Sequence, residues 1–188
     1  MLSISEIIAI IAMTFGIGYI FSDFFKKPLP EGYDPISYYS VRRSSVWENT
    51  KFAAMIAAPP VVLHELAHKI VAMAFGAIAT IKAPYLMYAI VILLKAVGFP
   101  IIFFVGGYVS HTVLPAFPSA MVAVAGPLTN FIIWGVCVLL VKNRLVNRKY
   151  YKVLVPMGRI SLFLGIFNMI PFPGFDGYHF FRNIISVF

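Results

Sequence analysis

Four apolar segments of this chain are each long enough to cross a lipid bilayer as a helix. A membrane-spanning helix needs about 20 mostly apolar residues, because the hydrocarbon core of a bilayer is about 30 Å thick. The four segments cover residues 4–25, 52–75, 119–141 and 153–170. A small water-soluble domain leaves much of its surface exposed, so it could not hide this many apolar side chains. We therefore predict a chain that folds within a membrane.

The composition and charge support this prediction. Of the 188 residues, 61% are hydrophobic and 12% are charged, whereas soluble domains average about 45–50% apolar and about 25% charged residues. In a soluble protein, the formal net charge of +8 could indicate a nucleic-acid partner. Here the basic residues flank the apolar segments, and no basic stripe with interleaved aromatic residues appears. A role at the membrane surface is therefore favoured, and no nucleic-acid partner is expected.

Residues 76–118 are apolar but interrupted. A short β-like run ends at Pro84, the next apolar run contains Lys95 and Gly98, and a run rich in β-branched and aromatic residues follows. The region could form one membrane helix, two half-helices, or a hairpin with a re-entrant piece. We predict an all-α polytopic membrane protein with about four to six transmembrane segments, together with a small membrane-associated β-hairpin or re-entrant region.

Two polar segments between the apolar runs are predicted to be loops. Residues 26–51 contain Pro28, Pro30 and Pro35, which disfavour regular structure. Residues 142–152 form a short segment rich in lysine and arginine.

The second apolar segment contains the sequence HELAH at residues 64–68. His64 and His68 lie four residues apart, so a helix places them on one face about one turn apart. Two imidazoles in this arrangement can bind one zinc ion, and Glu65 is placed to reach a water molecule on that ion. The same pattern can occur by chance on an exposed helix face. Within a membrane segment, however, ionisable side chains are costly and usually line a functional cavity.

A catalytic zinc ion needs a third protein ligand and an open position for water. The best candidate is Asp176, which follows the last apolar segment in the sequence FNMIPFPGFDGYHF. The prolines and glycines around Asp176 break the helix there. Irregular backbone at membrane depth is tolerated only in a protein interior or a cavity, so an acidic residue in this stretch indicates a site.

Three sequences, HELAH, AGPLTN and NMIPFPGFDG, occur in this order and together resemble the motifs of the site-2 protease family of intramembrane metalloproteases. The resemblance covers residues 52–188, whereas residues 1–51 show none. We therefore divide the chain into an N-terminal transmembrane helix with a polar linker (1–51) and a metalloprotease core (52–188). The resemblance also likens residues 77–83 and 101–108 to a membrane-embedded β-hairpin of the family.

The resemblance implies a role for each motif residue. His64, His68 and Asp176 would be the zinc ligands, and Glu65 would be the catalytic acid and base. Two asparagines would contact substrate or stabilise the transition state: Asn130 and Asn168. Alternatively, Asn130 forms a hydrogen bond between helices and Asn168 braces the broken helix. For His111 and His179, a capping or interfacial position is favoured over a role beside the metal.

These motifs predict an intramembrane zinc metalloprotease with one Zn²⁺ per chain. It would hydrolyse peptide bonds of membrane-embedded or membrane-tethered substrates. Its partners would be a membrane protein or peptide substrate and the lipid bilayer, and its oligomeric state is left open. One alternative is a catalytically silent membrane scaffold, which would have no need for Glu65. Another is a metal transporter, a class that often contains inverted repeats, and none is evident in the sequence.

The predicted ligands impose a topology. The two histidines lie within the second segment and Asp176 follows the last one, so they meet only if residues 76–118 return to the side of the membrane where they began. The basic residues of 26–51 and 142–152 then share one side, which the positive-inside rule assigns to the cytoplasm. The family resemblance instead places the active site toward the cytosol, so both orientations of this multi-pass protein stay open.

Overall fold

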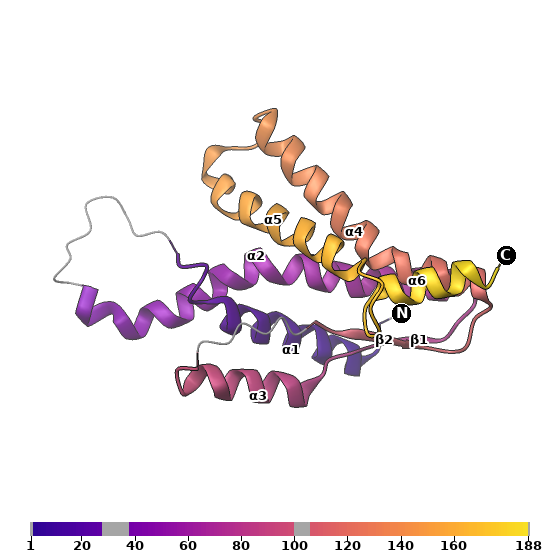
Figure 1. The fold of residues 1–188 in the computed structure, drawn as a ribbon. Coiled ribbons are helices and arrows are strands. Elements are labelled where there is room, and N and C mark those ends of the chain that lie inside the picture. The colour runs from indigo at the N-terminus through magenta and orange to yellow at the C-terminus, as the bar shows by residue number, and fades with distance from the viewer. Residues whose placement is uncertain (1, 28–37, 100–105, 188) are drawn as a thin grey trace.

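The computed structural model describes residues 2–27, 38–99 and 106–187, with no side chains described for 38–45. Helices dominate the described residues, and a single two-stranded sheet accompanies them (Figure 1). In chain order the elements are α1 (Ile4–Phe21), α2 (Tyr38–Ala74), β1 (Ala79–Lys82), α3 (Tyr85–Ala96), β2 (Tyr108–His111), α4 (Ala116–Lys142), the 3₁₀-helix η1 (Arg148–Tyr150), α5 (Tyr151–Asn168) and α6 (Asp176–Ile185).

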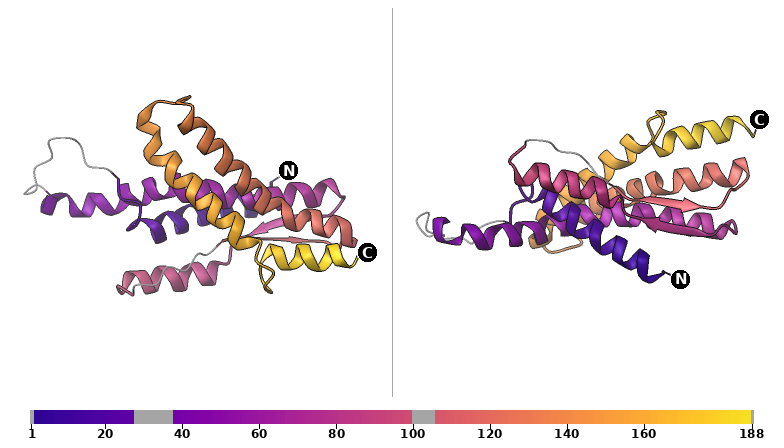
Figure 2. Two further views of the ribbon diagram at one scale, coloured as in Figure 1. Left: turned by 45° about the horizontal axis from the view of Figure 1, so that its top comes forward. Right: turned by 90° about the horizontal axis from the view of Figure 1, so that it is seen from below.

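The long helix α2 is the central element of the fold. Helix α1 packs along it, α4 packs against its second half, and α5 packs back against α4 (Figures 1 and 2). The short C-terminal helix α6 then runs beside the first part of α4. Fully buried apolar side chains from α1, α2 and α5, namely Met13, Ile17, Ile56 and Leu164, fill the interior between these helices.

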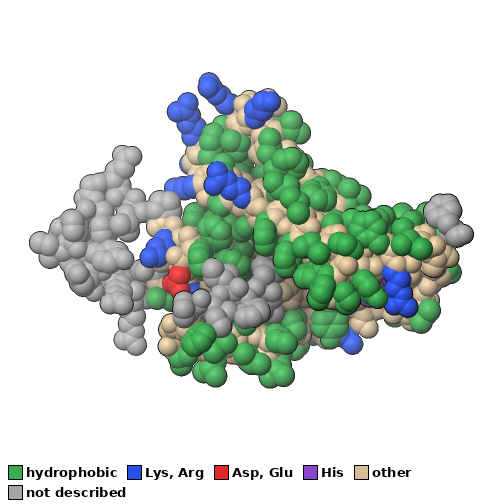
Figure 3. Space-filling view, viewed as in Figure 1, with side chains coloured by type: hydrophobic (Ala, Val, Ile, Leu, Met, Phe, Trp, Pro, Cys, Tyr) green, Lys and Arg blue, Asp and Glu red, His purple; other side chains and the backbone are tan. Residues whose placement is uncertain are grey.

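Three helical stretches of the described chain are long and apolar enough to cross a membrane. They are Ile4–Phe21, Ala116–Lys142 and Arg148–Asn168. Large apolar side chains are exposed on their outer faces (Figure 3), as expected for helices that contact lipid. The count is lower than the predicted four to six. Helix α2 is not among the three, and α3 is only 12 residues long.

The predicted loop over residues 26–51 is wrong in its second half, because α2 already begins at Tyr38. The prolines that suggested a loop lie in residues 28–35, which fall outside the described part of the chain. Residues 38–51 contain neither proline nor glycine, so the helix can extend through them. Its first turns are held against α1 by Trp47, whose ring stacks on Phe15 with centroids 6.0 Å apart. Pro59 and Pro60 lie inside the continuous helix and do not start a new one.

Residues 76–118 return the chain to where the region began, as the predicted topology requires. Strands β1 and β2 pair antiparallel, with Ala79 opposite His111 and Lys82 opposite Tyr108. The predicted strand at 77–83 is therefore present. Of the predicted strand at 101–108, only the end is described, and β2 continues to His111.

Lys95 attaches α3 to α1. Its ammonium group donates to the backbone carbonyls of Tyr19 and Ile20, to the Ser22 hydroxyl at 2.7 Å, and pairs with Asp23 at 3.1 Å. These carbonyls belong to the last turn of α1, where a cation is stabilised by the helix dipole. The Tyr19 carbonyl also accepts from the backbone N–H of Ser22 at 3.3 Å. Lys95, which interrupts the apolar run of α3, thus caps the C-terminal end of α1.

Candidate active site

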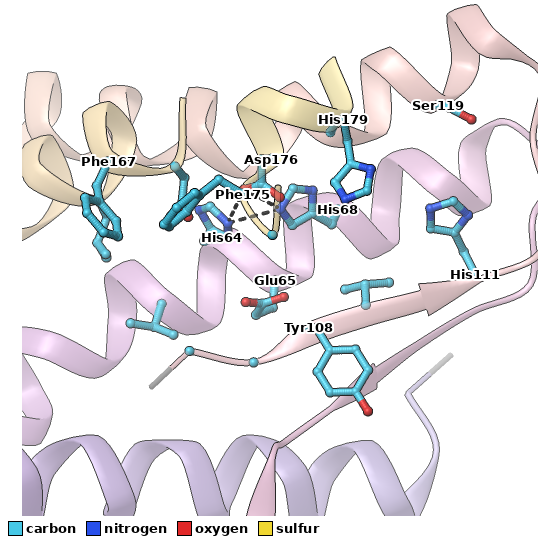
Figure 4. Close-up of a pocket in the computed structure, with 18 of the residues that line it drawn as sticks. His64, Glu65, His68, Tyr108, His111, Ser119, Phe167, Phe175, Asp176 and His179 are labelled. Carbon is cyan, nitrogen blue, oxygen red and sulfur yellow. Dashed lines mark hydrogen bonds and ion pairs between the residues drawn. The ribbon is translucent and has the colours of Figure 1, made fainter. Parts of the chain in front are cut away.

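Three candidate ligands from α2 and α6 meet at one point. The Nε2 atoms of His64 and His68 lie 3.0 and 3.3 Å from Oδ2 of Asp176, and 3.0 Å from each other (Figure 4). Two donors bound about 2.0 Å from one tetrahedral ion would be roughly 3.3 Å apart. The spacing of these three atoms therefore fits a single metal ion, and the three residues form a cluster that could hold one.

The backbone between α5 and α6 sets the position of Asp176. Gly174 has a φ of +101°, a conformation that glycine adopts without steric cost. A Cβ atom on Gly177 would overlap the backbone of Met169, at the end of α5. The two glycines thus let α6 start tightly against α5. Asp176 is the first residue of α6, where the helix dipole stabilises a negative charge.

The ring of His68 is oriented by a hydrogen bond on its far side. Its Nδ1 lies 2.7 Å from the carbonyl oxygen of Val122 in α4. A carbonyl only accepts, so Nδ1–H donates and the lone pair of Nε2 in the neutral ring is directed at the cluster. This is the usual way in which a second contact fixes the tautomer of a metal-binding histidine.

Asn130 plays the corresponding part for His64. It is fully buried on α4, and its amide nitrogen lies 3.0 Å from Nδ1 of His64, while its Oδ1 has no described partner. A His64 that binds a metal through Nε2 carries its proton on Nδ1. A half-turn of the nearly symmetric amide would then present Oδ1 to that proton. The unpartnered oxygen therefore fits a metal-bound His64.

Helix α4 approaches the two histidines at Gly126. A Cβ atom there would lie 2.5 Å from Nε2 of His64 and would also overlap Nε2 of His68. Any larger residue would intrude on the space that an ion bound by both nitrogens needs.

The first prediction tests this close approach. Gly126→Ala should weaken metal binding by about tenfold or more, because overpacking of this kind costs about 1–3 kcal/mol. Titration of the purified protein with zinc measures the affinity. Gly135→Ala is the matched control, because a Cβ there meets nothing within 4 Å. Equal zinc affinity of Gly126→Ala and wild type would contradict the prediction.

The cluster opens onto a cavity of about 590 Å³ that contains Glu65. Glu65 follows His64 on α2, and its carboxylate lies between the histidines and β2 (Figure 4). Strand β2 comes close because residue 107 is glycine: a Cβ there would lie 3.2 Å from Cγ of Glu65 and 2.5 Å from Sδ of Met13. The candidate metal ligands, the Glu65 carboxylate and strand β2 thus line the same cavity.

Comparison with known proteins agrees with the geometry. Residues 134–188 match the model of peptidase family M50. A protein of Methanocaldococcus jannaschii, provisionally named a zinc metalloprotease, is 34% identical over 118 residues, which are 62% of this chain and 61% of that protein. A second protein of this organism, named a zinc metalloprotease, is 30% identical over 148 residues, or 78% and 38% of the two chains. No solved structure matches.

Residues 134–188 are thus similar to peptidase family M50, the site-2 protease family, and both relatives carry the name of a zinc metalloprotease. The chain is an integral, multi-pass membrane protein, with three apolar helices of its described part long enough to cross a bilayer. It aligns with less than two thirds of the length of either relative. The matched region of the family model includes Asn168 and Asp176.

Three of the remaining predicted residues lie around the same cavity. Asn168, His111 and His179 all line it, whereas Asn130 lies behind His64 and does not. Neither His111 nor His179 belongs to the three-residue cluster. Gly107 was not predicted as a site residue, and its one signal in the sequence is the pair of adjacent glycines at 106 and 107.

A buried ion pair behind the site was also missed. Glu6 of α1 accepts a hydrogen bond from Lys69, the residue after His68, and another at 2.9 Å from the backbone N–H of Ile81 in β1. Its carboxylate also accepts from the backbone N–H of Ser3 at 2.8 Å. Glu6 and Lys69 are only 2% and 5% exposed. The pair connects α1, α2 and β1 beside the two histidines.

Proposed function

We propose that this chain is a zinc-dependent intramembrane endopeptidase that cleaves membrane-embedded or membrane-tethered proteins or peptides. The observation that carries the proposal is the convergence of His64, His68 and Asp176 next to Glu65, in one cavity of an apolar helical protein. The names of the two relatives support zinc as the metal.

The proposed mechanism assigns a task to each group. His64, His68 and Asp176 would hold the ion. When bound, zinc supplies a Lewis acid that polarises the scissile carbonyl and acidifies a water molecule. Glu65 takes the proton of the attacking water and returns it to the departing amine. Asn130 holds the ring of His64 from behind, and Asn168, on the cavity wall, contacts the substrate.

Strand β2 provides a way to hold the substrate. A helical substrate hides its peptide bonds, so it must be extended before cleavage. One edge of β2 pairs with β1, and in the described part of the chain no strand pairs with its other edge. Tyr108, Val109 and His111 of β2 line the cavity. An extended substrate could add to this free edge through backbone hydrogen bonds, next to Glu65.

The zinc content of the purified, detergent-solubilised protein tests the proposal without a known substrate. We expect about one zinc per chain in the wild type, none in His68→Ala and a weakened site in Asp176→Ala, since a catalytic zinc has three protein ligands. His179→Ala is the control, because His179 lines the cavity outside the cluster. If the wild-type protein binds no zinc after zinc is added back, the proposal of a zinc-dependent peptidase is wrong. An unchanged zinc content in Asp176→Ala would exclude Asp176 as the third ligand.

A further inference from the structure

The tip formed by the ends of α4 and α5 is strongly basic. Six exposed cations surround it, and Figure 3 shows them gathered where the two helices meet. They are Lys142, Arg144, Arg148, Lys149, Lys152 and Arg159. The sequence contains no aspartate or glutamate between Glu65 and Asp176, and none of the six forms an ion pair with a described residue. The tip therefore carries a positive charge that the described protein does not balance.

Arg159 differs from the other five cations in its depth. It lies about two turns into α5, roughly 12 Å along the helix from Tyr151, and within the stretch Arg148–Asn168 that can cross a membrane. Its side chain is exposed. An exposed charge within a membrane span is costly unless it reaches the interface or an anionic partner. Arg159 must therefore either reach the interface or pair with an anionic group, and no described residue supplies that group.

A groove between α4 and α5 leads to this arginine. It has a volume of about 300 Å³, and Arg159 and Lys142 line it together with apolar side chains that include Trp134, Val138 and Leu154. Gly158 is also part of its wall, and a Cβ there would lie 3.0 Å from Cβ of Cys137. The two helices thus touch at Gly158, beside a groove that is apolar inside and carries two cations.

We propose that this groove binds one anionic phospholipid, with its phosphate on Arg159 and Lys142 and an acyl chain along the apolar wall. The guanidinium group forms two parallel hydrogen bonds with a phosphate, and basic pockets between membrane helices suit anionic head groups. Free phosphate would leave the apolar wall uncovered, whereas a phospholipid satisfies both parts of the groove. The site does not depend on the peptidase activity proposed above.

Tryptophan fluorescence can detect the lipid directly, because Trp134 lines the groove. The chain has only one other tryptophan, Trp47, so a Trp47→Phe background isolates the signal of Trp134. The full chain is placed in phosphatidylcholine vesicles that contain increasing amounts of phosphatidylglycerol with brominated acyl chains, which quench tryptophan on contact. The same titration with brominated phosphatidylcholine is the control that measures non-specific quenching.

We expect half-maximal quenching at a much lower mole fraction of brominated lipid in the vesicle for phosphatidylglycerol than for phosphatidylcholine. Arg159→Gln should raise that fraction about tenfold, because it removes charge-assisted hydrogen bonds to the phosphate. Lys149→Gln is the matched control: it removes an equal charge from the tip but lies outside the groove, so a purely surface effect should be about fivefold at most.

Three results would overturn the proposal. Equal quenching by the two brominated lipids would mean that the groove has no preference for an anionic head group. Equal effects of Arg159→Gln and Lys149→Gln would mean that the tip attracts anionic lipid only through its surface potential. Relief of quenching by excess inorganic phosphate would mean that the cations bind any phosphate and the acyl chain contributes nothing.

Discussion

Replacement of Glu65 by glutamine is expected to abolish peptide hydrolysis while zinc stays bound. Glutamine has almost the same shape as glutamate, so it should pack equally well between the histidines and β2, but it cannot accept a proton from water. General base catalysis contributes about 10²–10⁴-fold to the rate, and a loss of this size is expected. Glu65 is not among the three clustered ligands, so the zinc content should not change.

The measurement pairs a cleavage assay with zinc analysis on the same preparations. A panel of single-span membrane peptides, each with a fluorophore and a quencher on opposite sides of the span, reports hydrolysis by the wild type and the variant. Glu48→Gln is the control, because Glu48 is on the same helix and its ion pairs with described residues are those with Lys27 and Lys51, at 2.7 and 3.1 Å. A Glu65→Gln enzyme that cleaves at the wild-type rate would refute the proposed mechanism.

Replacement of Lys69 by methionine is expected to destabilise the protein by about 3–5 kcal/mol, because a buried ion pair that loses one partner leaves an uncompensated buried charge. Methionine fills a similar volume, so the loss arises from the isolated Glu6 carboxylate and not from a cavity. Glu6 also anchors β1 through the N–H of Ile81. The thermal unfolding midpoint in detergent should therefore fall, and the zinc site next to Lys69 should be lost at a lower temperature.

The double variant Glu6→Gln/Lys69→Met provides the decisive comparison. It removes both charges, and glutamine can still accept the hydrogen bond from Ile81, so much of the lost stability should return. Lys51→Met is the control for a surface pair: its ion pair with Glu48 is solvent-exposed, and such pairs contribute about 0–1 kcal/mol. If the double variant is no more stable than Lys69→Met, the isolated charge is not the cause.

The elements that the sequence predicts well are those set by local rules. Apolar length indicates the helices α1, α4 and α5, because the thickness of a bilayer fixes the length of a span. Helical pitch places His64 and His68 on one face, and this holds wherever the helix packs. The prolines and glycines around Asp176 indicate a break in the chain before α6, and the structure places α6 directly after that break.

The elements that the sequence does not predict depend on packing between distant segments. Helix α2 extends back to Tyr38, and its N-terminal half meets α1 through the stacking of Trp47 on Phe15. Lys95 and Glu6 lie in apolar runs, and only the fold reveals that one caps α1 and the other pairs with Lys69. The partners of these last two contacts lie 76 and 63 residues apart in the chain, respectively. No local sequence pattern specifies such a partner.

The sequence by itself therefore indicated the membrane environment, the main helices and the residue types of the candidate site. Each of these follows from residue type and short-range spacing. The tertiary structure alone decided that Asp176 lies 3.0 Å from His64 and that Gly126 leaves room between the two histidines. It also decided that the edge of β2 away from β1 pairs with no strand of the described residues. These are contacts between α2, α4, α6 and the sheet, and they exist only after the helices pack, because burial and close approach are properties of the assembled core.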